Sequence, residues 1–385
     1  MADVTGGKEA CPFSASAPFP VGLFPCRRDE WFFPCPADVT RAIPKERAST
    51  LALLKSSKSE TNLPEPLTHV PAPTTPPSKD TPAAWWTKAA WEAYLRGIEL
   101  PECGLFPLSE FAATEWVTGI GIDDETGTQD GESIYSAEYL RLRPDVDLGF
   151  AAGMHSVNDA DALEALRREA PGLTVGGQQR VSRMERLEGS LGMFLPLSPP
   201  VSGGRVKWVL LSPAIFPASE NPGGGPVAGA CPGWLPSWIH PESGEVLLKT
   251  MRPDAKRWYA ERDGKRRAKR HVATGDIHAR LVAARIPKPI VVNGFSRRAN
   301  LAEDDQIAGP REILLAVPAG AVFYFEADGA DESEKTTNAQ ALVSALSWHG
   351  SASTTDTATK ILHRRSTLWG EKGYGIGVCG TWETF

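Results

Sequence analysis

Residues 115–143 read EWVTGIGIDDETGTQDGESIYSAEYLRLR. Trp116 to Ile122 mixes apolar, β-branched and glycine residues, which is typical of a strand with little side-chain bulk. Asp123 to Gly131 is entirely polar or glycine, a composition typical of loops, and apolar residues return after it. The stretch predicts a long β-hairpin with a polar tip, followed by Arg141 and Arg143 on one side of its second strand. An ordinary surface hairpin would satisfy the same pattern.

The length and composition are those of a globular protein. The chain has 385 residues, enough for two domains with a sizeable core. Its 36 glycines and 33 prolines predict long irregular connections rather than a compact α/β enzyme. No stretch approaches the ~20 apolar residues of a membrane span, and the N-terminus lacks the pattern of a signal peptide. We expect a cytoplasmic protein without membrane contact.

The cysteines give no sign of a metal site. They lie at positions 11, 26, 35, 103, 231 and 379. They form no CxxC pair and no cluster with histidine at ligand spacing. We expect reduced thiols, no bound metal and no other cofactor.

The charge distribution points to nucleic acid. The net charge of −6 argues against non-specific coating of nucleic acid. Between Arg252 and His271, however, nine Lys/Arg oppose three acids, so this segment carries +6 and the remainder −12. Trp258 and Tyr259 interrupt the strip, and rings beside arginines fit single-stranded RNA, whose bases stack and whose phosphates pair with charge. A solvated, helical charged surface is the alternative.

Other segments predict the remaining elements. Residues 44–83 are rich in Pro, Ser and Thr and predict a flexible linker that cannot bury a core. Residues 84–97 have Trp86, Trp91 and Tyr94 at helical spacing, which predicts a helix whose rings pack in a core or a subunit interface. Strands are predicted at 147–152, 173–183 (broken at Gly176 and Gly177), 206–216, 286–295, 313–325 and 373–382, and helices at 158–170 and 339–346.

Several motifs resemble one family. The run E-x-x-T-G-I-x-I-D-x-x-T-G-T-x-x-G-x-x-x-Y from Glu115 to Tyr135 resembles the hairpin of the RAMP-fold subunits of type III CRISPR effector complexes, in particular the third Cmr subunit. The P-x-P-x-D turn at 34–38, GWLPSW at 233–238 and the terminal GYGIGVCGTW at 373–382 agree in order. The resemblance covers most of the chain from Leu23 onward.

Three departures from the family pattern stand out. The family has an opening strand and helix start that this sequence lacks before Leu23. It usually has arginine where Val117 stands and an acid where Gln178 stands.

The resemblance implies an α+β fold with two ferredoxin-like (RRM-like) RAMP domains that carry long insertions. The first domain would be incomplete at its N-terminus. On this reading 1–43 is a remnant of the first domain, 44–83 the linker, 84–143 a helix plus the hairpin, and 144–385 the second domain with its glycine-rich final strand.

The resemblance also implies a function. The chain would be a non-catalytic RNA-binding scaffold of a type III-B complex in antiviral defence. It would hold the 5′ tag of the crRNA, dock the large polymerase-like subunit, contact backbone RAMP subunits and meet target RNA indirectly. The expected RNA-binding residues are Thr126, Gly127, Thr128, Tyr135, Arg141, Arg143, Arg180, Arg183, Lys265, Arg266, Arg267, Lys269, Arg270, Gly373, Gly375 and Gly377.

Four alternatives compete with this assignment. Gly375, Gly377 and Gly380 satisfy G-x-G-x-x-G, but only five residues follow, so no helix can hold a dinucleotide there. The same glycines serve either close approach to RNA phosphates or close packing of a last strand. A metal-independent crRNA-processing endoribonuclease of the same superfamily is the alternative function, although no histidine pairs in sequence with a second His or Lys. Asp123 and Asp124 could hold a metal, yet a solvated acidic tip explains them more simply.

Overall fold

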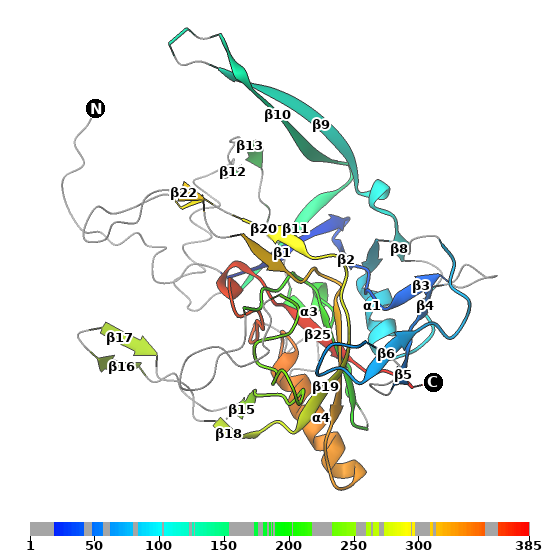
Figure 1. The fold of residues 1–385 in the computed structure, drawn as a ribbon. Helices are drawn as coiled ribbons and strands as arrows, with labels where there is room; N and C mark the ends of the chain where they lie inside the picture. Colours follow the sequence, from blue (N-terminus) through cyan, green and yellow to red (C-terminus); the bar gives the residue numbers. More distant parts are fainter. Residues whose placement is uncertain are drawn as a thin grey trace.

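A computed structural model describes the fold of this chain (Figure 1). It describes residues 19–384 except 42–47, 57–61, 80–83, 102–103, 123–124, 127, 154–172, 176–179, 183–184, 186, 188, 202, 218–232, 252–258, 263–264, 269–272, 294, 297–308, 311–312 and 351–360. The described part is rich in strands and has few helices, which confirms the expected α+β class.

An N-terminal sheet of five strands has the order β11-β1-β2-β7-β8, and all neighbours are antiparallel. The strands are β1 (Phe19–Arg27), β2 (Glu30–Pro34), β7 (Trp85–Thr87), β8 (Leu105–Phe106) and β11 (Asp147–Gly153). Helix α1 (Lys88–Leu95) follows β7 directly, and the Thr87 hydroxyl caps it by accepting the Ala90 N–H at 3.3 Å. The expected helix at 84–97 is confirmed in its central part.

A second antiparallel sheet has the order β19-β24-β14-β25. Its strands are β14 (Arg205–Leu210), β19 (Ala279–Arg285), β24 (Val322–Ala327) and β25 (Gly377–Gly380). Helix α4 (Glu332–Leu346) connects β24 to β25 and buries Leu342, Val343 and Leu346. The Asp331 carboxylate caps this helix by accepting the Glu334 N–H at 2.8 Å.

Eight further pairs of strands are described, among which β9 and β10 are long and the others short. The pairs are β3 (Val39–Arg41) with β4 (Ala48–Thr50), β5 (Ala52–Lys55) with β6 (His69–Ala72), β9 (Ala112–Ile122) with β10 (Gln129–Leu142), β12 (Leu173–Val175) with β13 (Arg180–Ser182), β15 (Lys249–Met251) with β18 (Ala273–Asp276), β16 (Tyr259–Arg262) with β17 (Lys265–Ala268), β20 (Ile290–Val292) with β23 (Leu314–Ala316), and β21 (Phe295–Ser296) with β22 (Gly309–Pro310). Short helices are η1 (Leu108–Glu110), α3 (Leu191–Phe194) and η2 (Gly370–Lys372).

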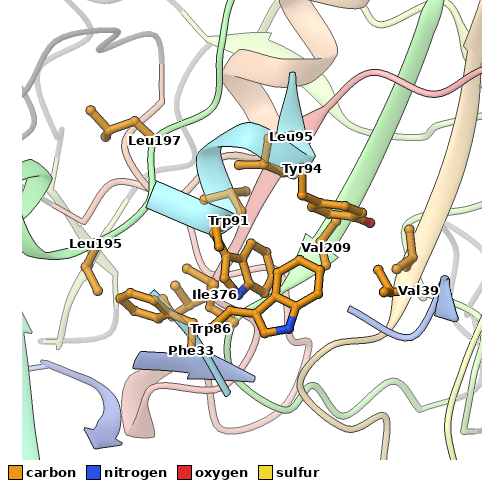
Figure 2. Packing of buried hydrophobic residues seen from close by; sticks show 14 of the residues in the cluster. Phe33, Val39, Trp86, Trp91, Tyr94, Leu95, Leu195, Leu197, Val209 and Ile376 are labelled. Atoms are coloured by element: carbon orange, nitrogen blue, oxygen red, sulfur yellow. The ribbon is translucent and has the colours of Figure 1, made fainter. Parts of the chain in front are cut away.

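The two sheets share one hydrophobic core. Figure 2 shows Phe33, Trp86 and Trp91 of the N-terminal part packed with Val209 and Ile376 of the C-terminal part. Trp86 and Trp91 are fully buried, so the interpretation of these rings as core residues is confirmed. This cluster draws on both sheets. The C-terminal sheet has in addition a second buried cluster, in which Trp208 and Phe323 pack with Leu342 of α4.

A buried polar network also joins the sheets, and we call it the junction: Asp38, Tyr94, Lys207 and Tyr324. The Asp38 carboxylate accepts the Tyr94 hydroxyl at 2.6 Å and the Tyr324 hydroxyl at 2.9 Å. Lys207 Nζ lies 4.0 Å from the same carboxylate and 3.4 Å from the centre of the Tyr94 ring. Asp38 and Lys207 are 1% and 3% exposed. Burial lowers the pKa of Lys207 to about 8, although Asp38 favours its charged form.

The segment 44–83 is not the flexible linker that its composition predicts, at least where it is described. Its strands β5 and β6 pair with each other, and the Leu53 N–H donates to the Glu383 carbonyl at 3.1 Å. Leu53 is buried in the shared core. Thr68 also donates to the Val282 carbonyl of β19 at 2.9 Å. The linker prediction is wrong for residues 48–55 and 69–72 because a few apolar residues among the prolines suffice to dock them.

The boundary expected at residue 144 does not follow the sheets. Strand β11 pairs with β1 from Phe19↔Gly153 to Cys26↔Asp147, so it belongs to the N-terminal sheet. The strand predicted at 173–183 is instead two short strands that pair with each other. The strand predicted at 313–325 is β23 and β24 with a turn between them. The helix predicted at 339–346 begins earlier, at Glu332. The helix expected at 158–170 lies outside the described residues.

Candidate nucleic-acid interface

The hairpin predicted for residues 115–143 is present. Strands β9 and β10 pair in antiparallel register from Ala112↔Leu142 to Ile120↔Ile134, and the register shifts toward the tip. Figure 1 shows this ribbon extending well beyond the two sheets. At the tip, the Thr126 and Thr128 hydroxyls lie 2.9 Å apart and both residues are exposed. Gly127 lies outside the described residues. The tip therefore presents hydroxyl groups at the far end of a long ribbon.

The root of the hairpin is anchored to the body by two arginines. Arg27 Nη2 donates to the Glu110 carbonyl at 2.7 Å, and its Nε lies 2.9 Å from an Asp145 carboxylate oxygen. Arg143 Nε donates to the Ser109 carbonyl at 3.1 Å. These contacts fix residues on both sides of the hairpin, so its direction relative to the sheets is set by the fold.

The two faces of the ribbon differ. Residues that are directly opposite on paired strands share a face, so Glu115, Tyr139 and Arg141 lie on one face. Arg141 Nη2 lies 2.9 Å from each Glu115 carboxylate oxygen, and the Arg141 side chain is 71% exposed. An exposed ion pair of this kind contributes little to stability, so a phosphate can replace the carboxylate at small cost. The backbone of Tyr135 pairs opposite Gly119 on the same face.

The opposite face of the ribbon carries large exposed apolar residues, which the sequence reasoning did not single out. They are Trp116, Ile120, Ile122, Ile134, Leu140 and Leu142, which we call the apolar face. The signal was present in the sequence, because these residues lie at every second position of 112–122 and 134–142. The other positions of that series are Ala112, Thr114, Thr118, Ser136 and Glu138.

Where the structure describes it, at 259–262 and 265–268, the basic strip forms strands rather than the helix considered as an alternative. Strands β16 and β17 pair from Tyr259↔Ala268 to Arg262↔Lys265, which places Lys265, Arg266 and Arg267 on one strand. Lys269 and Arg270 lie outside the described residues. Figure 1 shows this pair apart from the β9–β10 ribbon. The structure therefore does not gather the predicted basic residues around the hairpin.

Of the remaining predicted residues, Arg180 begins β13 and pairs opposite Val175. Arg183 lies outside the described residues. The neighbouring Val181 is exposed. The structure therefore shows this segment as a short hairpin of two paired strands.

The terminal glycines are packed inside the protein. Gly373, Gly375 and Gly377 are all buried. The Gly375 N–H donates to the Pro213 carbonyl at 2.7 Å, and a Cβ at this position would lie 1.9 Å from the Ser366 nitrogen. Gly377 pairs opposite Leu210, with the Trp208 ring against its Cα. Of the two interpretations left open, close packing of the last strand is the one that the geometry supports.

A family model described as CRISPR-associated protein (Cas_Cmr3) matches residues 14–382. The chain belongs to the Cas_Cmr3 family. This match spans nearly the whole sequence and confirms the resemblance to the third Cmr subunit drawn from the hairpin, the P-x-P-x-D turn and the terminal glycines.

Solved structures similar to this Cas_Cmr3 chain are distant. One chain comes from the cryo-EM structure of the Type III-B Cmr-beta bound to cognate target RNA, with 13% identity and a TM-score of 0.34. A second comes from the same assembly with cognate target RNA and AMPPnP, with 12% identity and a TM-score of 0.32. Each alignment covers 80% of this chain and 65% or 66% of the other. The chain thus spans about two thirds of their length. No curated protein matches.

The described residues offer few groups for metal or acid–base chemistry. Among them, no three His, Cys, Asp or Glu side chains are placed to hold a metal ion. Asp123 and Asp124 lie outside this part. His69 Nδ1 lies 2.9 Å from the Thr68 hydroxyl, and His240 Nδ1 accepts backbone N–H groups. Burial lowers the pKa of His363 to about 3, so this ring stays neutral. Within the described part, no helix has the length and apolar character to cross a membrane.

Proposed function

We propose that this chain is a non-catalytic, RNA-binding scaffold subunit of a type III-B CRISPR effector complex. The observation that carries the proposal is the Cas_Cmr3 family match over residues 14–382. The chain holds the 5′ tag of the crRNA and docks the large polymerase-like subunit. Backbone RAMP subunits complete the groove, and target RNA is met indirectly through the guide.

The strand order of the C-terminal sheet supports a RAMP-type fold. Taken in chain order, β14, β19, β24 and β25 are strands 1 to 4, and they lie in the order 4-1-3-2 with α4 between strands 3 and 4. This is the order of a ferredoxin-like unit. We infer one such unit here, and a second that is incomplete in the N-terminal sheet. The two units share a core, so they act as one rigid support.

The hairpin is the element that we assign to the guide. Its root is held by Arg27 and Arg143, and its tip presents the Thr126 and Thr128 hydroxyls. Arg141 stands beside Tyr139 on one face and can exchange Glu115 for a phosphate. Hydroxyls, a cation and a tyrosine on one ribbon match a single strand of RNA, whose phosphates accept hydrogen bonds and whose bases stack on rings.

The experiment places 4-thiouridine in the 5′ tag of a crRNA within a complex that contains this chain. After irradiation, cross-linked peptides are identified by mass spectrometry. We expect cross-links in the peptides that contain residues 112–143. A control crRNA with 4-thiouridine only at its 3′ end gives none there. Cross-links from the tag that fall entirely on other subunits overturn the proposal.

A further inference from the structure

The apolar face of the hairpin is exposed in a way that needs an explanation. Its six residues stand on one side of β9 and β10, with Ile120 directly opposite Ile134. Trp116 is 68% exposed and Ile134 is 72% exposed. A ribbon surrounded by water on both sides would be expected to be polar on both faces. Exposed apolar residues gathered on one face instead mark a surface that another molecule covers.

The residue types on the apolar face favour a protein, rather than RNA, as the molecule that covers it. The other positions on it are Ala112, Thr114, Thr118, Ser136 and Glu138. Neither Lys nor Arg occupies any of these positions, so no cation is offered to a phosphate there. Glu138 is exposed and would repel one. Five of the six large side chains are Ile or Leu, which bind apolar protein surfaces and offer no ring for a base to stack on.

The chemistry also disfavours a second copy of the chain. Each copy carries a net charge of −6, so two copies repel each other. Glu138 pairs opposite Trp116 within the face. Pairing the face with itself would therefore bury two carboxylates, whereas a different protein can present a cation to Glu138.

We propose that the apolar face docks on an apolar surface of a neighbouring protein subunit that presents a Lys or Arg to Glu138. The opposite face, with Glu115, Tyr139 and Arg141, then turns toward the guide RNA. This inference rests on the proposed function for the identity of the assembly. It adds that one ribbon is shared between a protein contact and an RNA contact, which lie on opposite sides.

The test compares two variants at adjacent positions. Trp116→Thr with Ile134→Thr changes the apolar face, and Val117→Thr changes an exposed apolar residue on the opposite face. Threonine is β-branched and favours strands, so the strands are retained. Each tagged chain is co-expressed with the large polymerase-like subunit, the backbone subunits and crRNA. The protein subunits retained on the tagged chain are quantified before and after RNase treatment.

We expect the double variant to lose at least ten-fold of one partner subunit after RNase treatment, while Val117→Thr retains it. Unchanged thermal unfolding of both variants shows that the fold is intact. Full retention of all partners by the double variant overturns the inference. Loss of the partner subunits from the tagged wild-type chain after RNase treatment also overturns the inference, because RNA rather than protein then covers the apolar face. Self-association of wild type that the double variant abolishes assigns the face to a second copy, which is equally contrary.

The outcome is separable from that of the proposed function. If the 5′ tag cross-links to other subunits while the double variant still loses its partner, the docking inference stands and the guide assignment fails. If the tag cross-links to residues 112–143 and the double variant keeps its partner subunit, the guide assignment stands and the docking inference fails.

Discussion

The junction and the hairpin each hold a cation–carboxylate pair, but in opposite surroundings. Lys207 and Asp38 are almost completely buried between two sheets, and two tyrosine hydroxyls complete the carboxylate's hydrogen bonds. Arg141 and Glu115 stand on a ribbon in contact with solvent. Removing one partner in the junction leaves an uncompensated buried charge, whereas removing one in the hairpin leaves a charge that water solvates.

This difference in surroundings assigns the two regions different roles: the junction stabilises the fold, and the hairpin is available for binding. The junction fixes how the two sheets meet, and its groups are buried away from solvent. The hairpin contributes little to the core, so its residues are free to serve contacts with RNA and protein. Substitutions in the junction should therefore change the free energy of unfolding, and substitutions in the hairpin should change assembly instead.

The largest effect on stability is expected at Gly375. Its φ is +79°, and an added Cβ would lie 1.9 Å from the Ser366 backbone nitrogen. Gly375→Ala should destabilise the chain by more than about 5 kcal/mol or prevent folding. Gly203 is a matched control, since its φ is +72° with nothing within 4 Å of the added Cβ. Gly203→Ala should cost only about 1–2 kcal/mol. Equal losses in urea denaturation would show that packing at Gly375 does not matter.

Asp38→Ala should have the second-largest effect on stability. It removes the carboxylate beside Lys207 and the acceptor of the Tyr94 and Tyr324 hydroxyls. We expect a loss of about 3–5 kcal/mol in the free energy of unfolding. The counterpart in the hairpin is Glu115→Ala, which should cost less than about 1 kcal/mol. Similar losses for the two variants would erase the distinction between the junction and the hairpin.

Two adjacent leucines test the corrected view of residues 48–55. Leu53 is 1% exposed and belongs to the shared core, whereas Leu54 is 51% exposed. Leu53→Ala should lower the free energy of unfolding by about 2–5 kcal/mol because it leaves a cavity. Leu54→Ala should change it by less than about 0.5 kcal/mol. If neither substitution changes the unfolding midpoint, this segment is the flexible linker after all.

The buried lysine should make stability depend on pH. Burial lowers the pKa of Lys207 to about 8, below that of an unfolded lysine. Above pH 8 the unfolded chain therefore binds one proton more than the folded chain, and stability rises with pH. Buried Cys35 and Cys379 have raised pKa values and act in the opposite direction, so the comparison needs Lys207→Met. The stability of wild type relative to this variant should increase by about 1 kcal/mol from pH 7 to pH 9.

Denaturation curves at pH 7, 8 and 9 measure this difference. A constant difference between wild type and Lys207→Met would mean that Lys207 stays protonated in the fold. Above about pH 10 the difference should level off, because a lysine in the unfolded chain then loses its proton as well. The raised pKa values of Tyr94 and Tyr324 affect wild type and variant alike and cancel in the comparison.

Local patterns predicted the elements whose partners are close in sequence. The hairpin was visible because a polar tip separates two apolar runs, and β14 because Val206 to Leu210 is buried on both faces. Helix α4 was underestimated although Asp331 and Glu334 form a capping pattern that marks its start.

The missed features depend on distant partners. Asp38 stands in a proline turn that resembles the family motif, yet its partners Tyr94 and Tyr324 are 56 and 286 residues away. Leu53 belongs to a buried run of only three residues, 51–53, among prolines and polar residues, so composition hid its role. The assignment of β11 to the N-terminal sheet required its pairing with β1, which no sequence pattern reveals. The packing of Gly375 against Ser366 is equally non-local.

If the hairpin holds the guide RNA, shortening the hairpin should release it. A variant in which residues 124–130 are replaced by a two-residue turn should fold normally, since a tight turn can join the same strands. The measurement is the crRNA that co-purifies with the assembled complex, together with target cleavage by that complex. Asp123→Ala with Asp124→Ala serves as control and should retain both guide and cleavage. We predict that the shortened hairpin reduces guide occupancy at unchanged chain stability. Full guide occupancy with the shortened hairpin would contradict the account, as would a specific loss of cleavage in the double alanine variant.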